Sequence, residues 1–514
     1  MDRRRRRFLQ ALAIVGGGLL PSESLAAQGP LRNVTLGPGD YRRLPLLGLA
    51  TTLAEEYAYP PRIEGALPFG LKGVLFRNGP GRFDRNGLRK RCLLDGDGMV
   101  QSFRFSKGKA YYSNRFVRTT KYLEETAAGK YLYSTWSTQA PGGFWKNLGG
   151  GHFANQAGIS VVVRDGRLFA FDEFHPPYEL DPETLDTLGE SRLGLEAGQT
   201  VFSAHTKLDR KTGDWIFFGL DFGRRTDLHL TVLGADGRLR KHQVFTLPRF
   251  AYMHDFFVTE RHILLNLHPV EMDIWGFLLG LTSMTGSMRW APEKGNLLLA
   301  FSRESNVPPV MLEAETAWMW HSLNAYEDGE GRIVADFVGY RNPDHFLGKD
   351  PALFAIMEGR MGDYRYPGEL RRYRIDLAAR RLEEETLEAG NFEFPMVDPL
   401  RLCRRHRFGY FARIPGKENF FTAISRVDFE SGRMSTYDFG PAVYCSEPVF
   451  AAEPGRSATD DEPGWLLTEV YDGKTQKSFL AVLDARDLAS GPCAGIHLTH
   501  HTPLGFHGFW HPEA

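Results

Sequence analysis

Four histidines that lie far apart in the chain share one kind of setting, with small, apolar or amide neighbours. They are His205, His254, His321 and His507. Imidazole binds iron, copper and zinc alike, but zinc is usually closed by four such ligands. Four neutral imidazoles leave positions open on an ion that tends toward octahedral geometry. We therefore expect the four side chains to meet at one iron, because dioxygen activation requires an open position beside reduced iron.

Three glutamates lie in apolar, strand-like settings where an unpaired charge would be costly. They are Glu173, Glu393 and Glu447. A metal-bound imidazole usually donates its other N–H to a carboxylate or a carbonyl. We expect these glutamates to hold the histidines from behind. The alternative for each is a glutamate at a strand end that faces solvent.

Short strand-like segments separated by turn residues recur along the chain. Residues 159–163 and 168–171 flank Asp165 and Gly166, a pair typical of a hairpin turn. Many short strands with few convincing helices predict an all-β fold, as a sandwich, a barrel or a propeller. The length and even composition favour a propeller, although no strict internal repeat is present. A propeller can bring one ligand per blade to a common axis, which explains the irregular spacing of the four histidines.

The composition is that of an ordinary globular protein. Of the 514 residues, 42% are hydrophobic and 24% are charged. Aromatic residues, at 13%, are frequent enough for β-structure and large apolar cavities. The net charge of −1 gives no reason to expect a nucleic acid partner.

The N-terminus has the order of a secretory signal: a basic region, an apolar run and small residues. Residues 5–9 read RRRFL, which fits the twin-arginine pattern. A short membrane anchor is the alternative, but the apolar run is too short to span a bilayer. We expect residues 1–27 to be a twin-arginine signal peptide and residues 28–514 to form a single domain in the periplasm.

Residues 272–288 depart from the strand pattern and are rich in apolar side chains, among them Trp275, Phe277 and Leu281. One interpretation is a core helix or loop. The other is an apolar lip that guards a cavity mouth or makes a peripheral contact with a membrane.

The sequence resembles the carotenoid cleavage oxygenase family over nearly the whole mature chain. The matching stretches include FRNGP at 76–80, DGDGM at 95–99 and FHG at 506–508. The resemblance implies a seven-bladed β-propeller with a helical, loop-rich cap over the active site. It implies one non-haem Fe(II) per subunit, bound by His205, His254, His321 and His507. It also implies that three of these histidines are held by Glu173, Glu393 and Glu447.

The sequence departs from the family pattern beside two of these histidines. Thr206 stands where proline is commoner, and Phe509 stands where threonine is frequent. Neither change affects a ligand.

The implied reaction is oxidative cleavage of a C=C bond. Dioxygen and an apolar alkene are the partners, and the products are two carbonyl compounds. An apocarotenoid or carotenoid is the substrate that we favour. A non-catalytic propeller that binds an isoprenoid or a lipid is a further alternative, although it would not need an open metal site.

A stilbene or another phenylpropanoid alkene is the second substrate class. The resemblance implies that stilbene cleavers engage a phenolic hydroxyl through a tyrosine and a lysine. Lys121 is the candidate lysine for that substrate contact, although it could also be a solvated strand residue. Arg91 and Cys92 stand where the tyrosine is expected, which weakens the stilbene hypothesis.

Overall fold

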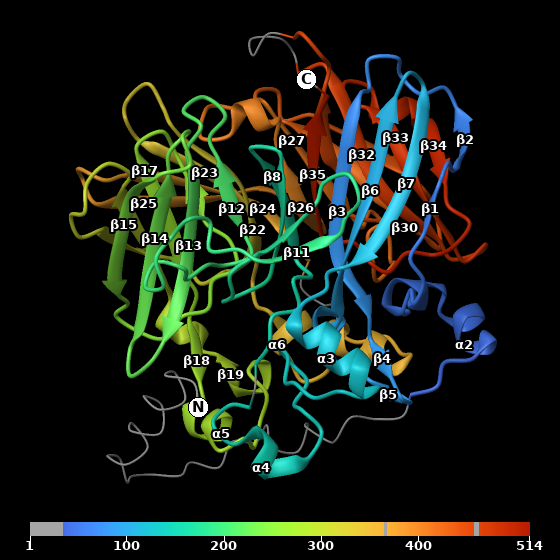
Figure 1. Cartoon of the computed structure of the whole chain (residues 1–514). Helices are drawn as coiled ribbons and strands as arrows, with labels where there is room; N and C mark the ends of the chain where they lie inside the picture. The colour runs from blue at the N-terminus through green and yellow to red at the C-terminus, as the bar shows by residue number, and fades with distance from the viewer. Residues whose placement is uncertain (1–33, 152, 364–366, 457–461, 514) are drawn as a thin grey trace.

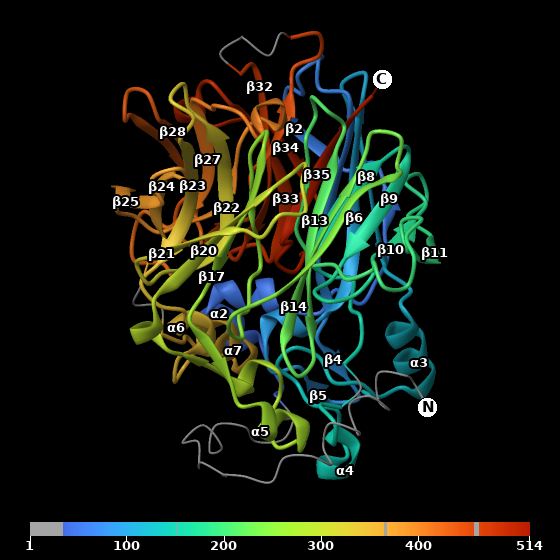
Figure 2. The same cartoon turned by 90° about the vertical axis from the view of Figure 1, so that its left-hand side faces the viewer.

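The computed structural model describes residues 34–151, 153–363, 367–456 and 462–513. Within these ranges, seven antiparallel sheets of four to six strands surround one axis. The α-helices gather at one end of the molecule, as both views show (Figures 1 and 2). The predicted all-β, seven-bladed propeller with a helical cap is therefore confirmed. The predicted signal peptide lies outside the described residues, so export stays a prediction.

Five blades are simple four-stranded meanders. They are β8–β11 (Ser160–Arg164, Arg167–Phe171, Tyr178–Leu180, Thr187–Glu190), β12–β15 (Thr206–Leu208, Trp215–Phe222, Thr226–Leu233, Leu239–Thr246), β16-β17-β20-β21 (Phe257–Val258, His262–Leu267, Asn296–Ser302, Val310–Ala314), β22–β25 (Trp318–Glu327, Ile333–Tyr340, Glu369–Asp376, Arg381–Glu388) and β26–β29 (Phe392–Met396, Phe408–Arg413, Ala423–Asp428, Met434–Asp438).

The other two blades combine strands from both ends of the chain. One has the order β2-β34-β33-β32-β30, with β31 also on β32 (Arg62–Gly65, Pro492–His497, Lys477–Asp484, Gly464–Asp472, Val443–Cys445; β31 Val449–Ala452). The other has the order β1-β7-β6-β3-β35 (Ala58–Tyr59, Lys109–Phe116, Asp97–Ser106, Gly73–Arg82, His507–Pro512).

Local sequence explains both the turns and the burial of the strands. The β8–β9 hairpin turns at Asp165 and Gly166, with φ of 52° and 71°, as expected for an Asp-Gly turn that needs two positive φ values. All eight residues of β23 are buried, because neighbouring blades cover both faces of a central strand. Such strands read as continuous apolar runs rather than as an alternating pattern.

The cap grows from long connections between strands. It contains α3 (Thr120–Ala128) and α4 (Gly143–Asn147) between β7 and β8, and α6 (Asp344–Leu347) and α7 (Ala352–Ala355) between β23 and β24. A third connection, between β17 and β20, holds β18 (Val270–Met272), α5 (Ile274–Leu278) and β19 (Met288–Trp290). All these elements lie at the same end of the propeller (Figures 1 and 2).

The predicted apolar stretch 272–288 falls in this third connection. Met284 and Met288 pack into a buried cluster with Trp136 and Trp318, as the core interpretation requires. Ile274 and Leu281 are 39% and 43% exposed. Across the described residues, no helix is long and apolar enough to cross a membrane.

The ring closes without a covalent link, by pairing of β35 with β3. Arg77 of β3 is fully buried at this closure. Its guanidinium donates to the Ser446 hydroxyl (2.8 Å), to the Gly505 carbonyl (3.0 Å), and to the Glu447 carbonyl and carboxylate (both 3.2 Å). One cation therefore joins the closing strand to the neighbouring blade.

We predict that Arg77→Met lowers the free energy of unfolding by about 3–5 kcal/mol, because it leaves a buried carboxylate without its cation. Denaturant titration measures this loss. Arg62→Met is the control, since Arg62 and its partner Glu64 are both 65% exposed and such a pair contributes less than about 1 kcal/mol. Equal losses in the two variants would contradict a special role for Arg77.

Candidate metal centre

The structure brings the four predicted histidines together. His205 immediately precedes β12, His254 lies just before β16, His321 is within β22, and His507 begins β35. One ring nitrogen of each lies within 4.8 Å of the others. The ring centroid of His205 is 4.5 Å from those of His254 and His507 and 5.0 Å from that of His321. Four blades thus contribute one imidazole each to the propeller axis.

The three predicted glutamates each accept from the Nδ1 of one histidine. Glu393 Oε2 lies 2.6 Å from His321 Nδ1, and Glu447 Oε1 lies 2.8 Å from His507 Nδ1. Glu173 Oε1 makes the same contact with His254. Because an ionised carboxylate only accepts, Nδ1 carries the proton in each pair. The solvent-facing alternative is wrong, since the three glutamates are 1–5% exposed.

Further donors hold each carboxylate in place. Tyr340 Oη donates to Glu393 Oε1 (3.0 Å), the Ser203 hydroxyl donates to Glu173 Oε2 (3.0 Å), and the Gly508 amide donates to Glu447 Oε2 (2.7 Å). The register of β22 shifts around His321, and that of β26 shifts just after Glu393. Such irregularities re-aim side chains out of the regular alternation.

Burial keeps two of the imidazoles neutral. Burial and the three neighbouring imidazoles hold the pKa of His205 well below its ordinary value of 6.5. Burial lowers the pKa of His507 to about 4, although Glu447 opposes the shift. Burial would also lower the pKa of His321, but the carboxylates of Glu393, Asp255 and Glu447 together outweigh burial and raise that pKa. His205 and His507 therefore carry free lone pairs at neutral pH.

The donor set fits a divalent transition metal. With Nδ1 protonated in three of the rings, their Nε2 lone pairs are the free donors. His321 Nε2 is buried and has no hydrogen-bond partner among the described residues, while His205 Nε2 lies 3.0 Å from His254 Nε2. A dication among these nitrogens would satisfy lone pairs that otherwise face one another.

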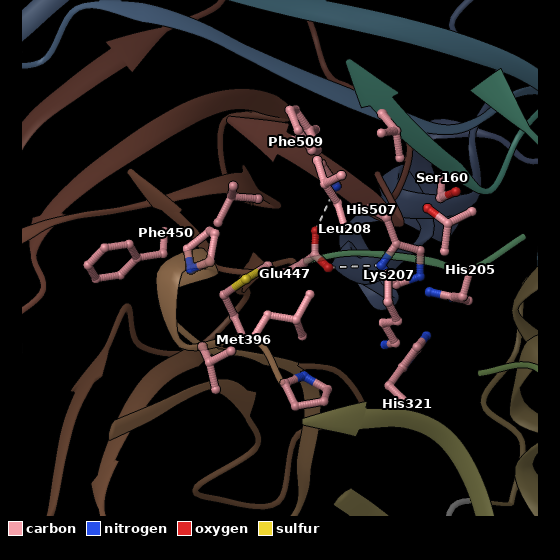
Figure 3. Close-up of a pocket in the computed structure, with 18 of the residues that line it drawn as sticks. Ser160, His205, Lys207, Leu208, His321, Met396, Glu447, Phe450, His507 and Phe509 are labelled. Carbon is pink, nitrogen blue, oxygen red and sulfur yellow. Dashed lines mark hydrogen bonds and ion pairs between the residues drawn. The ribbon is translucent and has the colours of Figure 1, made fainter. Parts of the chain in front are cut away.

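A cavity of about 210 Å³ reaches the cluster along the axis. His205, His321 and His507 line its inner end, and Phe509 of β35 lines it farther along (Figure 3). Trp510 of β35 also lines the cavity. Strand β35 runs toward the C-terminus, at the end of the molecule opposite the helices (Figure 1). The cavity therefore approaches the histidines from the side away from the cap.

On the cap side, aromatic rings cover the cluster. The ring of Trp320 lies edge-on to His254 at 5.2 Å, and its indole N–H donates to His345 Nε2 at 2.6 Å. Tyr252 packs against Trp136 at 5.1 Å and against Trp318 at 5.8 Å. The centre thus has an apolar wall on the side where the cap meets the propeller.

Lys121 does not join the four histidines. It lies on α3 rather than on a strand and is 2% exposed, so the solvated-strand alternative is wrong. Its ammonium donates to Asp97 Oδ1 (2.5 Å) and to Glu125 Oε2 (3.1 Å). A substrate contact by Lys121 stays a prediction.

The sequence did not lead us to predict two residues beside the ligands, Lys207 and Asp255. The Lys207 ammonium forms an ion pair with the Asp255 carboxylate at 2.8 Å, and both residues line the axial cavity. Their positions in the sequence relative to two of the histidines could have indicated them. Lys207 follows His205 by two residues, a spacing that puts both on one face of a strand, and Asp255 directly follows His254.

The fold and the centre define a seven-bladed propeller with an axial four-histidine site. The sequence profile of the family described as retinal pigment epithelial membrane protein matches residues 50–512. The chain therefore belongs to this family, the carotenoid cleavage oxygenases. This match confirms the resemblance inferred from the sequence motifs.

Individual relatives agree with this assignment. The apocarotenoid-15,15'-oxygenase of Synechocystis is 31% identical over 467 residues, which cover 87% of this chain and 92% of that protein. The lignostilbene-alpha,beta-dioxygenase isozyme III of Sphingomonas paucimobilis is 26% identical over 472 residues, covering 87% and 92%. The solved structure of cobalt-substituted Synechocystis ACO superposes with a TM-score of 0.83 at 29% identity, covering 93% of this chain and 99% of that one.

We predict that Glu393→Gln weakens divalent metal binding by about 10–100-fold, because the amide keeps the hydrogen bond to His321 but not the charge that makes the imidazole a better donor. Titration of the metal-free protein with metal measures the change. Glu384→Gln is the control, since this partly buried glutamate pairs with Arg371 at 2.8 Å, away from the histidines. Wild-type affinity in the Glu393 variant would rule out the carboxylate's role.

Proposed function

We propose that the protein is a non-haem Fe(II) dioxygenase, with one iron per subunit, that cleaves a C=C bond of an apocarotenoid into two carbonyl products. The observation that carries the proposal is the convergence of four imidazoles, three of them backed by glutamates. The similarity to an apocarotenoid oxygenase supports this substrate class.

The reaction balances without an organic cofactor. Both bonds of the C=C are broken, and each carbon takes one oxygen atom of dioxygen. Iron bound at the centre would supply dioxygen activation. The protein's own residues supply position and environment. Glu173, Glu393 and Glu447 fix three imidazole rings, and the aromatic wall around Trp320 offers a dry apolar surface for an alkene.

Cleavage of a stilbene or another phenylpropanoid alkene is the second candidate. The similarity to a lignostilbene dioxygenase favours it. The engagement of the Lys121 ammonium by two carboxylates counts against this candidate, because a substrate phenol would have to compete with them. A non-catalytic isoprenoid-binding propeller is a third hypothesis, which iron content and dioxygen uptake would test.

We expect the iron-loaded protein to convert an apocarotenal under air into shorter carbonyl products, detected by mass spectrometry, with oxygen-18 from labelled dioxygen in both fragments. A 4-hydroxystilbene is run in parallel. His254→Ala removes one imidazole of the cluster and should abolish product formation. His262→Ala, a partly exposed histidine paired with Glu327, should leave it intact. Products from the stilbene alone would overturn the substrate class, and activity in His254→Ala would overturn the site.

Peripheral contact with a membrane is part of the proposal. Helices α4 and α5 lie side by side at the tip of the cap, joined by a hydrogen bond from the Gly149 amide to the Leu278 carbonyl at 2.6 Å (Figure 1). This tip exposes four large apolar side chains: Phe144 at 41%, Trp145 at 81%, Ile274 at 39% and Leu281 at 43%. Clustered exposed apolar residues favour a membrane or an apolar partner.

We predict that the double variant Trp145→Ser, Leu281→Ser binds neutral phospholipid vesicles less than the wild type, because it removes apolar surface from the tip. Co-sedimentation with the vesicles measures binding. Phe69→Ser is the matched control, since Phe69 is 74% exposed between β2 and β3, outside the tip. Equal sedimentation of all three proteins would contradict the membrane contact.

A further inference from the structure

His205 differs from the other three histidines in having no carboxylate behind it. Its one hydrogen-bond contact among the described residues is with another member of the cluster, His254. A metal ligand needs an external constraint to keep its ring aimed. For His205, the backbone at the start of β12 can supply that constraint, because His205 immediately precedes this strand.

Lys207 provides a fixed point two residues farther along. Its side chain is 12% exposed and lies beside His205 and His321 in the axial cavity (Figure 3). The ammonium lies 2.8 Å and 3.0 Å from the two carboxylate oxygens of Asp255, and it donates to the Ser322 hydroxyl at 3.0 Å.

The partners of Lys207 are themselves neighbours of ligands. Asp255 follows His254, and Ser322 follows His321. Asp255 Oδ2 also accepts from both the amide and the hydroxyl of Ser322, each at 2.8 Å. One buried ion pair therefore ties together three of the four segments that carry the histidines.

We propose that Lys207 is a positioning residue of the metal centre, which holds His205 in place where a carboxylate holds each of the other three. The ammonium fixes the start of β12 to the segments of His254 and His321, so the distances among the three imidazoles are set before any metal binds. This inference rests on the proposed metal-binding function.

The pair is not a free binding site for an anion. The Lys207 ammonium already contacts both carboxylate oxygens of Asp255 and the hydroxyl of Ser322. The competing explanation is that the pair only stabilises the fold, as other buried pairs do. The two explanations differ in one respect: only a positioning role links the ion pair to metal affinity and to the symmetry of the metal site.

The test compares Lys207→Met with Arg372→Met in otherwise intact protein. Arg372 also forms a buried ion pair, with side chains 11% and 0% exposed, and its guanidinium on β24 lies 2.7 Å from Asp336 on the adjacent strand β23, without a contact to any of the four histidines. Both variants lose a buried cation. Metal-free protein is titrated with Co(II), and the visible absorption of the bound ion reports affinity and ligand geometry. Thermal unfolding without metal reports fold stability.

We expect Lys207→Met to bind Co(II) about 10–100-fold more weakly and to shift its absorption spectrum. Arg372→Met should lower the unfolding temperature but keep the wild-type Co(II) affinity and spectrum. Lys207→Arg retains a cation for Asp255 and should restore most of the affinity. Wild-type Co(II) affinity and spectrum in Lys207→Met would overturn the proposal.

A second variant covers the case in which Lys207→Met does not fold. Ser322→Ala keeps the ion pair and the amide donated to Asp255, but it removes the hydroxyl that contacts both Lys207 and Asp255. It should therefore weaken Co(II) binding in the same direction as Lys207→Met, by a smaller factor. An unchanged affinity there would also overturn the proposal. Absence of Co(II) and Fe(II) binding by the wild type would instead refute the proposed metal centre itself.

Discussion

The need to aim four imidazoles into one buried space constrains the rest of the structure. Without fixed hydrogen-bond partners, these rings could rotate and accept hydrogen bonds from other groups. If the rings were protonated, their positive charges would repel one another. Glutamates behind three rings fix the tautomer that leaves Nε2 free. Those glutamates need buried donors in turn, which Tyr340, Ser203 and Arg77 supply. A propeller meets this demand because it brings many inner strand ends to one axis while its blades bury the supporting groups.

The two ends of the axis offer the centre different surroundings. Toward the cap lies an apolar wall of tryptophan, tyrosine and phenylalanine rings. Away from the cap, a cavity with both polar and apolar walls contains the Lys207–Asp255 ion pair. The histidines lie at the boundary, so they face apolar rings on the cap side, whereas the ligand strands are fixed by the ion pair on the other side.

Much of this arrangement could be predicted from the sequence, but its pairings could not. Asp165 and Gly166 specify their hairpin locally, and the four histidines and three glutamates stood out by their apolar settings. Which glutamate serves which histidine depends on how distant blades meet: Glu173 and His254 are 81 residues apart. The Lys207 contacts with Asp255 and Ser322 also depend on that geometry. Helix α3 was also not predicted, although the residues that begin and end it are local in the sequence. Thr119 caps its start by accepting from the Tyr122 amide, and Gly129 ends it with a φ of 63°.

The closing strand gives the protein an order of assembly. His507 begins β35, the last strand among the described residues, and β35 pairs with β3, which lies more than four hundred residues earlier. During synthesis the first three histidines emerge well before the fourth, because a long stretch of chain separates His321 from His507. Ring closure and completion of the four-nitrogen site are therefore the same event. A truncated chain lacks both, so an unfinished protein has neither a closed ring nor a complete set of ligands for the metal.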